Sequence, residues 1–210
     1  MKRLTLTGIA ALAFALGALA QGSINLDNSS GINYGVAIGA AGNYYTGTYG
    51  MEVWELSGAT SVPAGIDLPP AGSPALAYDD MVADGFKKEA TFANQAMTIP
   101  GTFSLGEVTL ADVTPAGSTV VLGLAVWNTS APSWAAMLSG AGANATGGVI
   151  AFVNPTAYAS SGPPPPPANL TGWNSVGDLV MAVPEPSVLA LAGAGVAALL
   201  ILRRRGPGNR

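Results

Sequence analysis

The sequence of 210 residues contains no cysteine and no histidine. The absence of cysteine excludes disulfides, thiol nucleophiles and thiolate metal sites. The absence of histidine removes the commonest general base, and with it the Ser-His-Asp arrangement and the usual catalytic zinc sites.

Charge is also scarce, at 10% of the residues, and most of it is acidic. Between positions 21 and 183 the basic residues are Lys87 and Lys88, whereas eleven of the twelve acidic residues lie there, so this region has a net charge of −9 against −4 for the whole chain. An acidic domain repels phosphate backbones, and we therefore expect no nucleic-acid partner. Contact with an acidic polysaccharide would require bridging divalent cations.

The N-terminal segment has the pattern of a signal peptide. Two basic residues, Lys2 and Arg3, precede an apolar stretch that ends in Ala18-Leu19-Ala20. Small residues at Ala18 and Ala20 are typical of a cleavage site, and the pattern predicts a signal peptide over residues 1–20 and a mature chain that starts at Gln21. We therefore expect the general secretion machinery to carry the chain across the inner membrane.

The C-terminal segment has three parts in a fixed order. A Pro-Glu-Pro motif comes first, an apolar run over 188–202 follows, and a basic tail ends it. The prolines fix their φ angles and donate no backbone hydrogen bond, which predicts an extended, accessible motif. As a helix the apolar run would span only about 22 Å of a hydrocarbon core about 30 Å thick, which favours a temporary transmembrane anchor. The arginines are expected to stop transfer through the membrane. The motif residues are Val183, Pro184, Glu185 and Pro186, and the stop-transfer residues are Arg203, Arg204 and Arg205.

This order of motif, apolar run and basic tail over residues 184–210 resembles the PEP-CTERM sorting signal of bacterial exported proteins. The resemblance implies that an exosortase, a membrane-embedded protease, recognises the signal and removes the tail near the motif. It also implies delivery to the cell surface or the extracellular space, often in connection with extracellular polysaccharide. The alternative interpretation is an ordinary single-pass anchor that happens to follow a proline-rich stretch.

The region between the two signals, residues 21–183, predicts an all-β fold: a single antiparallel β-sandwich-like domain, with the major helices confined to the ends of the chain. Short runs rich in Val, Thr, Tyr and Trp alternate with turns rich in Gly, Pro and Asn. The most apolar run, 118–127, is expected to be the central strand of the core. A short helix is predicted at 74–82, a helical turn on the surface or a strand cap at 133–138, and a proline-rich spacer at 162–167. The expected strands lie within 23–27, 36–38, 44–56, 87–99, 101–113, 118–127, 148–153 and 178–183.

Two groups of residues are weak candidates for binding. The acidic side chains of Asp79, Asp80 and Asp84 could offer oxygen ligands to calcium, but their spacing does not match an EF-hand loop, so solvated loop residues are the preferred interpretation. Trp134 and Trp173 lie in less regular stretches than the other large aromatic residues, which makes them the better candidates for surface contact with a glycan. The sequence predicts no cofactor and no firmly assigned metal site.

The sequence therefore favours a non-enzymatic protein of the cell surface or extracellular matrix. A polysaccharide-binding β-sandwich module is the alternative. A carboxylate-based glycoside hydrolase is a remote third interpretation, for which Glu52 with Glu55, or Asp79 with Asp84, would be the paired acids. No catalytic residue is assigned.

Overall fold

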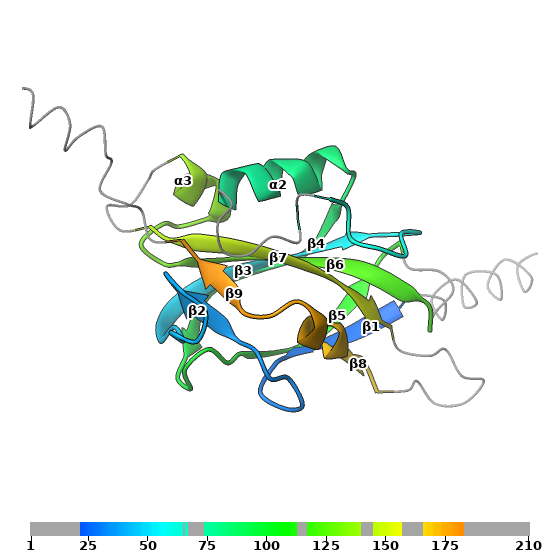
Figure 1. Cartoon of the computed structure of the whole chain (residues 1–210), viewed down its shortest axis with the longest axis horizontal. Coiled ribbons are helices and arrows are strands. Elements are labelled where there is room, and N and C mark those ends of the chain that lie inside the picture. The colour runs from blue at the N-terminus through cyan, green and yellow to red at the C-terminus, as the bar shows by residue number, and fades with distance from the viewer. Residues whose placement is uncertain are drawn as a thin grey trace, which may run out of the picture.

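The computed structural model describes residues 22–64, 66, 74–112, 117–139, 145–156 and 166–182 (Figure 1). This part of the chain is mainly β-strand with few helices, as the sequence predicts. The strands are β1 (Gly22–Asp27), β2 (Val36–Ile38), β3 (Gly47–Leu56), β4 (Lys87–Met97), β5 (Ser104–Leu110), β6 (Thr119–Asn128), β7 (Gly147–Pro155), β8 (Ala168–Asn169) and β9 (Leu179–Met181). The helical elements are α2 (Pro74–Ala83), α3 (Trp134–Leu138) and the 3-10 helix η1 (Thr171–Ser175).

A four-stranded antiparallel sheet forms the centre of the domain, in the order β4-β3-β6-β7. β6 lies in its interior, which confirms the prediction made from the apolar run 118–127. Residues Val120 to Trp127 of this strand are all buried, because both faces of the sheet are covered. A strand that packs on both faces has no polar side to alternate with, and so its sequence is continuously apolar.

The smaller sheets cover one face of the central sheet. One of them has the order β5-β1-β8 and the other is the pair β2-β9. Ile24 and Leu26 of β1 and Leu179 and Met181 of β9 are fully buried in the same core cluster as Leu124 of β6. This layering supports the sandwich-like prediction. The prediction of wholly antiparallel pairing is wrong in detail, because β1 pairs with β8 and β2 pairs with β9 in parallel.

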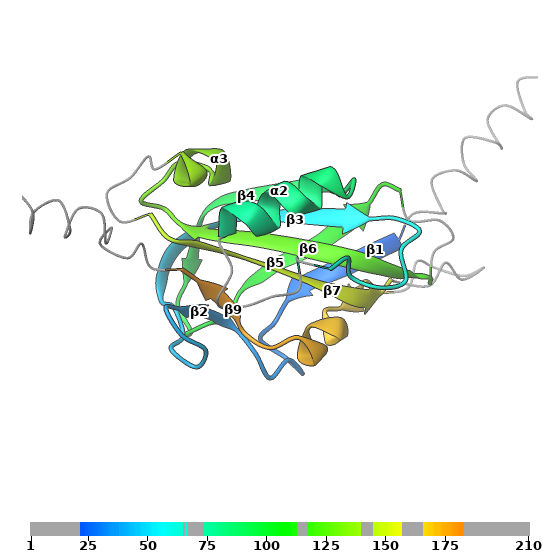
Figure 2. The ribbon, with the colours of Figure 1, turned by 45° about the horizontal axis from the view of Figure 1, so that its top comes forward.

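Helices α2 and α3 cover the opposite face of the central sheet (Figure 2). Met81 of α2 and Trp134 of α3 are fully buried there, in a second core cluster with Trp54 and Val121 of the sheet. The expected helix at 74–82 and the helical turn at 133–138 are confirmed. The expectation that the major helices are confined to the ends of the chain is wrong, because the ten-residue α2 forms a third layer of the domain.

The strand registers define the two ends of the domain. Gly47 of β3 pairs with Met97 of β4, Trp127 of β6 pairs with Gly147 of β7, and Gly147 also bridges to Ala182. We call this the exit end, because the last described residue lies here; it comprises the turns 39–46, 98–101, 129–133 and 145–147 together with Ala182. In Figure 1 the arrowhead of β9 points toward it, at the left.

Six of the twelve charged residues in the described part of the chain lie at the other end. Glu55 near the end of β3 lies opposite Lys87 at the start of β4, and Asp112 follows β5. We call this the carboxylate end, and it comprises Glu55, Asp84, Lys87, Lys88, Glu89 and Asp112. The chain enters β1 on this side, because Gly22 pairs with Leu110.

Candidate functional site

Strand β9 and the next residue, Ala182, directly precede the proline-containing motif. On one side, β9 pairs in parallel with β2, and the amide of Gly39 donates a 2.9 Å hydrogen bond to the carbonyl of Met181. On the other side, the amide of Ala182 donates to the carbonyl of Gly147 over 2.9 Å. Ala182 is therefore fixed in the fold from both flanks, two residues before Pro184.

A buried carboxylate secures the start of β9. Asp178 is 8% exposed. Its Oδ1 accepts a 2.9 Å hydrogen bond from the amide of Gly35, and its Oδ2 accepts a 2.8 Å bond from the amide of Gly42. Hydrogen bonds to a charged acceptor are stronger than neutral ones, so this carboxylate ties β9 to both flanks of β2.

Close backbone approach also fastens β9 to the central sheet. A Cβ added to Gly148 on β7 would overlap the carbonyl oxygen of Val180 and come within 2.9 Å of Cδ2 of Leu179. Only glycine leaves space for the strand to lie this near. The backbone before the motif is thus packed, paired and hydrogen-bonded as part of the domain.

A group of carboxylates lies at the other end of the molecule. Glu55 is 1% exposed, and its Oε1 accepts a 3.0 Å hydrogen bond from the amide of Asp112. Oε2 of Glu89 accepts a 3.0 Å bond from the preceding amide, that of Ala111. The carboxyl groups of two neighbouring strands therefore hold two consecutive amides of the segment after β5. Lys87 completes the group through an ion pair with Asp112.

Burial makes Glu55 electrostatically unusual. It raises the pKa of Glu55 to about 7, and the nearby carboxylate of Glu89 adds to the shift, while the hydrogen bond from the amide of Asp112 opposes it. Oε2 of Glu55 has no hydrogen-bond partner among the described residues. The pKa of Lys87 is raised by its hydrogen bond to Asp112. The carboxyl group of Glu55 is therefore poised to change charge near neutral pH.

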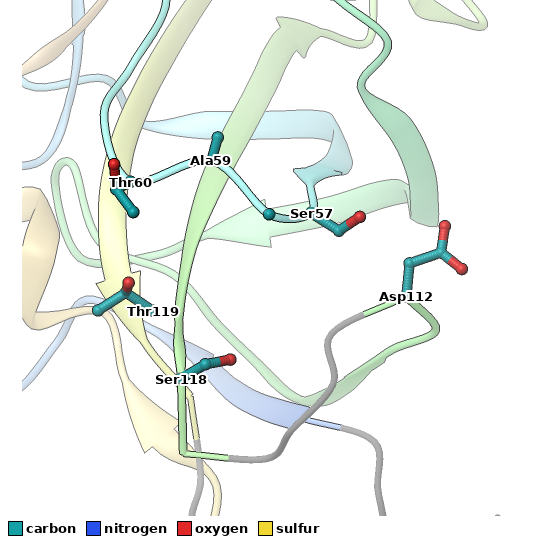
Figure 3. Close-up of a pocket in the computed structure, with 7 residues that line it drawn as sticks. Ser57, Ala59, Thr60, Asp112, Ser118 and Thr119 are labelled. Atoms are coloured by element: carbon teal, nitrogen blue, oxygen red, sulfur yellow. The ribbon is translucent and has the colours of Figure 1, made fainter.

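A polar hollow of about 390 Å³ lies beside this group (Figure 3). It is lined by Ser57, Gly58, Ala59, Thr60, Asp112, Ser118 and Thr119. The hydroxyl groups and the side chain of Asp112 can hydrogen-bond a small polar molecule. Among the described lining residues Asp112 supplies the carboxylate, and Glu55 does not reach the lining, so the hollow does not present the pair of acids that glycoside hydrolysis uses.

The paired acids considered from the sequence do not come together. Glu52 lies on the helix-covered face with Trp54, whose Nε1 donates to Oε2 of Glu52 over 3.2 Å, and Lys88 donates to Oε1 over 3.3 Å. Glu55 lies on the opposite face, because it pairs with Leu122, which belongs to the sandwich core. The burial of Glu55 could have been found from the sequence, since Met51, Val53 and Glu55 alternate onto one face.

The two tryptophans expected on the surface are in fact fully buried. Trp173 packs between Phe103 and Phe152, with ring centroids 5.6 Å and 6.0 Å away, and its Nε1 donates to the carbonyl of Gly177. Trp134 packs against Tyr78 and Trp127 at 5.5 Å and 6.2 Å. The expectation of a surface position is therefore wrong for both. Their stretches are irregular because η1 and α3 fold back onto the sheets and direct the rings inward.

The three acidic residues considered for calcium do not converge. Asp79 and Asp80 lie exposed on α2, and Asp84 is exposed in the turn that follows it. In the described ranges, no group of three acidic side chains is close enough to hold a metal ion. All three residues are exposed, with Asp79 and Asp80 on the helix and Asp84 in the turn after it, rather than together in one loop.

The terminal signals lie outside the described residues. This applies to Ala18, Ala20 and Gln21 at the expected signal-peptide cleavage site, to Val183 through Pro186, and to the stop-transfer arginines. None of the helices in the described portion is both long enough and apolar enough to cross a bilayer.

The described β-rich domain ends at Ala182, directly before the sequence that contains Pro184-Glu185-Pro186. Residues 182–205 match the family description PEP-CTERM protein-sorting motif. The chain thus carries a PEP-CTERM sorting signal, as the order of its C-terminal features indicates. No curated protein and no solved structure matches the chain.

Proposed function

We propose that this chain is an exported, non-enzymatic protein of the cell surface or extracellular matrix whose C-terminal signal is recognised and cleaved by an exosortase. The observation that supports this proposal is the match to the PEP-CTERM protein-sorting motif over 182–205. The signal peptide expected at residues 1–20 places the domain outside the inner membrane. The apolar run then anchors the chain until the tail is removed.

The position of β9 supports processing at the motif. β9 and Ala182 are held by hydrogen bonds, whereas proteases act on chain that can be drawn into an extended conformation. The first stretch beyond the anchored strand is the one that contains Pro184 and Pro186, which cannot pair as ordinary strand residues. A cut on the C-terminal side of Ala182 leaves the domain whole.

The test is to produce the full chain in cells with and without an exosortase and to determine the mass of the released protein. We expect release of a form that lacks residues 188–205 only when the exosortase is present. The triple variant with Pro184, Glu185 and Pro186 replaced by Ala should remain membrane-bound, and the matched control Pro207→Ala should be processed normally. Recovery of peptides from 188–205 in protein released to the surface would contradict the proposal.

The alternative of a polysaccharide-binding module loses its two named contacts. Trp134 and Trp173 are buried, and no platform of stacked sugar rings can form on them. Among the described large aromatic residues, Tyr34 and Tyr44 are the exposed ones, at 38% and 40%. A structural role at the surface or in the matrix is therefore the function that we propose.

A further inference from the structure

The exit end carries no charge in its described turns. The sequence has no charged residue within 28–51, 90–106 or 113–177, and these segments supply the turns 39–46, 98–101, 129–133 and 145–147. The carboxylate in contact with this end is Asp178, which is buried and hydrogen-bonded to two amides. Asp27 borders it at the end of β1, opposite Ser104. The charged groups instead gather at the carboxylate end.

The exit end also exposes two large apolar side chains. Ile99 is 62% exposed in the turn after β4, and Tyr44 is 40% exposed in the segment before β3. Their turns are joined, because the amide of Gly101 donates a 2.8 Å hydrogen bond to the carbonyl of Tyr45 and the ring of Tyr44 lies against Gly101. Exposed apolar side chains that lie on joined turns can mark a surface that another phase or a partner covers.

The covalent chain restricts how far this end can move from an anchored tail. Ala182 is fixed in the domain, and the apolar run begins six residues later at Val188. A fully extended chain covers at most about 3.5 Å per residue, so the two points are at most about 20 Å apart. The headgroup layer takes up about 5–8 Å of that distance on each side of a bilayer.

We propose that the exit end lies against the lipid surface while the tail is anchored, with Tyr44 and Ile99 at headgroup level and the carboxylate end directed away from the membrane. Aromatic side chains favour the membrane–water interface, and acidic surfaces are repelled by anionic headgroups. The orientation thus follows from the tether, the apolar side chains and the charge distribution together. It rests on the proposed function, because it requires the apolar run to enter the bilayer.

The absence of cysteine provides a direct test. The full chain is reconstituted into vesicles of phosphatidylethanolamine and phosphatidylglycerol, with a single spin label at Tyr44→Cys, Ile99→Cys or the control Val82→Cys. Val82 is 52% exposed on α2, beside the carboxylate end. When the vesicles also contain lipids with nickel-chelating headgroups, the spin relaxation of the labels at positions 44 and 99 should increase strongly. That of the label at position 82 should increase weakly. Equal relaxation at all three positions would overturn the orientation.

Flotation of the vesicles tests the anchoring of the chain separately from the orientation of the domain. A chain that does not float with the vesicles overturns the proposed anchoring, and the orientation with it. A chain that floats but shows no preference for positions 44 and 99 overturns the orientation alone. If an added exosortase abolishes the relaxation at these positions while the chain is still uncleaved and floats with the vesicles, the exit end contacts the protease, and the proposal of a lipid contact is overturned.

Charge substitutions give a second readout that does not depend on labels. Tyr44→Asp and Ile99→Asp should each weaken contact with the anionic vesicles by about fivefold, the factor that corresponds to about 1 kcal/mol per charge near such a surface. The matched control Val82→Asp should leave the contact unchanged. All three side chains are exposed, so their melting temperatures should agree and should exclude misfolding as the cause. An equal effect of all three variants would contradict the proposal.

Discussion

The buried carboxyl group of Glu55 predicts that the domain loses stability as the pH rises through neutrality. The pKa of this group is about 7 in the folded state, against 4.5 for an exposed glutamate. Between these two values the folded state keeps a proton that the unfolded state has released. The stabilising contribution is therefore complete below about pH 4.5, and it is lost as the pH rises from there through 7.

The size of the effect follows from the shift in pKa. One pKa unit corresponds to about 1.4 kcal/mol, so a shift from 4.5 to about 7 is on the order of 3 kcal/mol at pH 8. Burial is the main cause and the carboxylate of Glu89 is the next, and both act against the ionised form. A loss on this scale is a sizeable part of the stability of an ordinary domain.

Glu55→Gln tests this reasoning, because glutamine keeps an acceptor for the amide of Asp112 but cannot ionise. Urea unfolding of the segment 21–183 should give similar stabilities for variant and parent near pH 4.5, and should show the variant to be more stable by on the order of 3 kcal/mol at pH 8. Glu107→Gln removes an exposed carboxylate on β5 and serves as the control. A difference between variant and parent that does not change with pH would refute the reasoning.

Further predictions concern the core and the last strand. Trp173→Ala should cost about 3–5 kcal/mol in urea unfolding because it empties a fully buried site, and a loss below about 1 kcal/mol would contradict the packing described. Asp178→Ala should cost about 1–3 kcal/mol in the same assay, since two amides lose their acceptor; an unchanged midpoint would speak against this. Gly148→Val should displace β9, so that limited proteolysis cuts between Asp178 and Ala182, whereas the exposed Ala96→Val should stay resistant; equal resistance would show that the close approach is not needed.

Local sequence patterns predicted most strands but not how the layers cover one another. The alternating and apolar runs correspond to β1 to β7 and β9, because each pattern records burial along a single strand. The same patterns could not show that α2 covers the far face of the sheet. Glu52 and Trp54 lie on the face opposite to Met51 and Val53. The cover provided by α2 explains why they are buried as well. A pattern records burial without recording what provides it.

Long-range contacts explain why the sequence did not predict the parallel pair β2-β9 or the burial of Trp173. The parallel pair β2-β9 joins Val36 to Leu179, and nothing local to either short strand specifies the other. The glycine, asparagine and serine neighbours of Trp173 favour a surface position for its ring. However, η1 turns the ring between Phe103 and Phe152, which come from distant strands. In both cases the decisive partner is more than twenty residues away, beyond the reach of periodicity.

The arrangement of β9 links completion of the fold to the position of the sorting signal. Leu179 and Met181 are fully buried, and burying a side chain of this size stabilises a domain by about 1.5–3 kcal/mol. A cut before Leu179 would remove both side chains together with the parallel partner of β2. A cut beyond Ala182 removes none of these contacts. The sorting motif therefore begins directly after the last residue whose backbone the described domain holds, and under the proposed function the fold would set the N-terminal limit of processing.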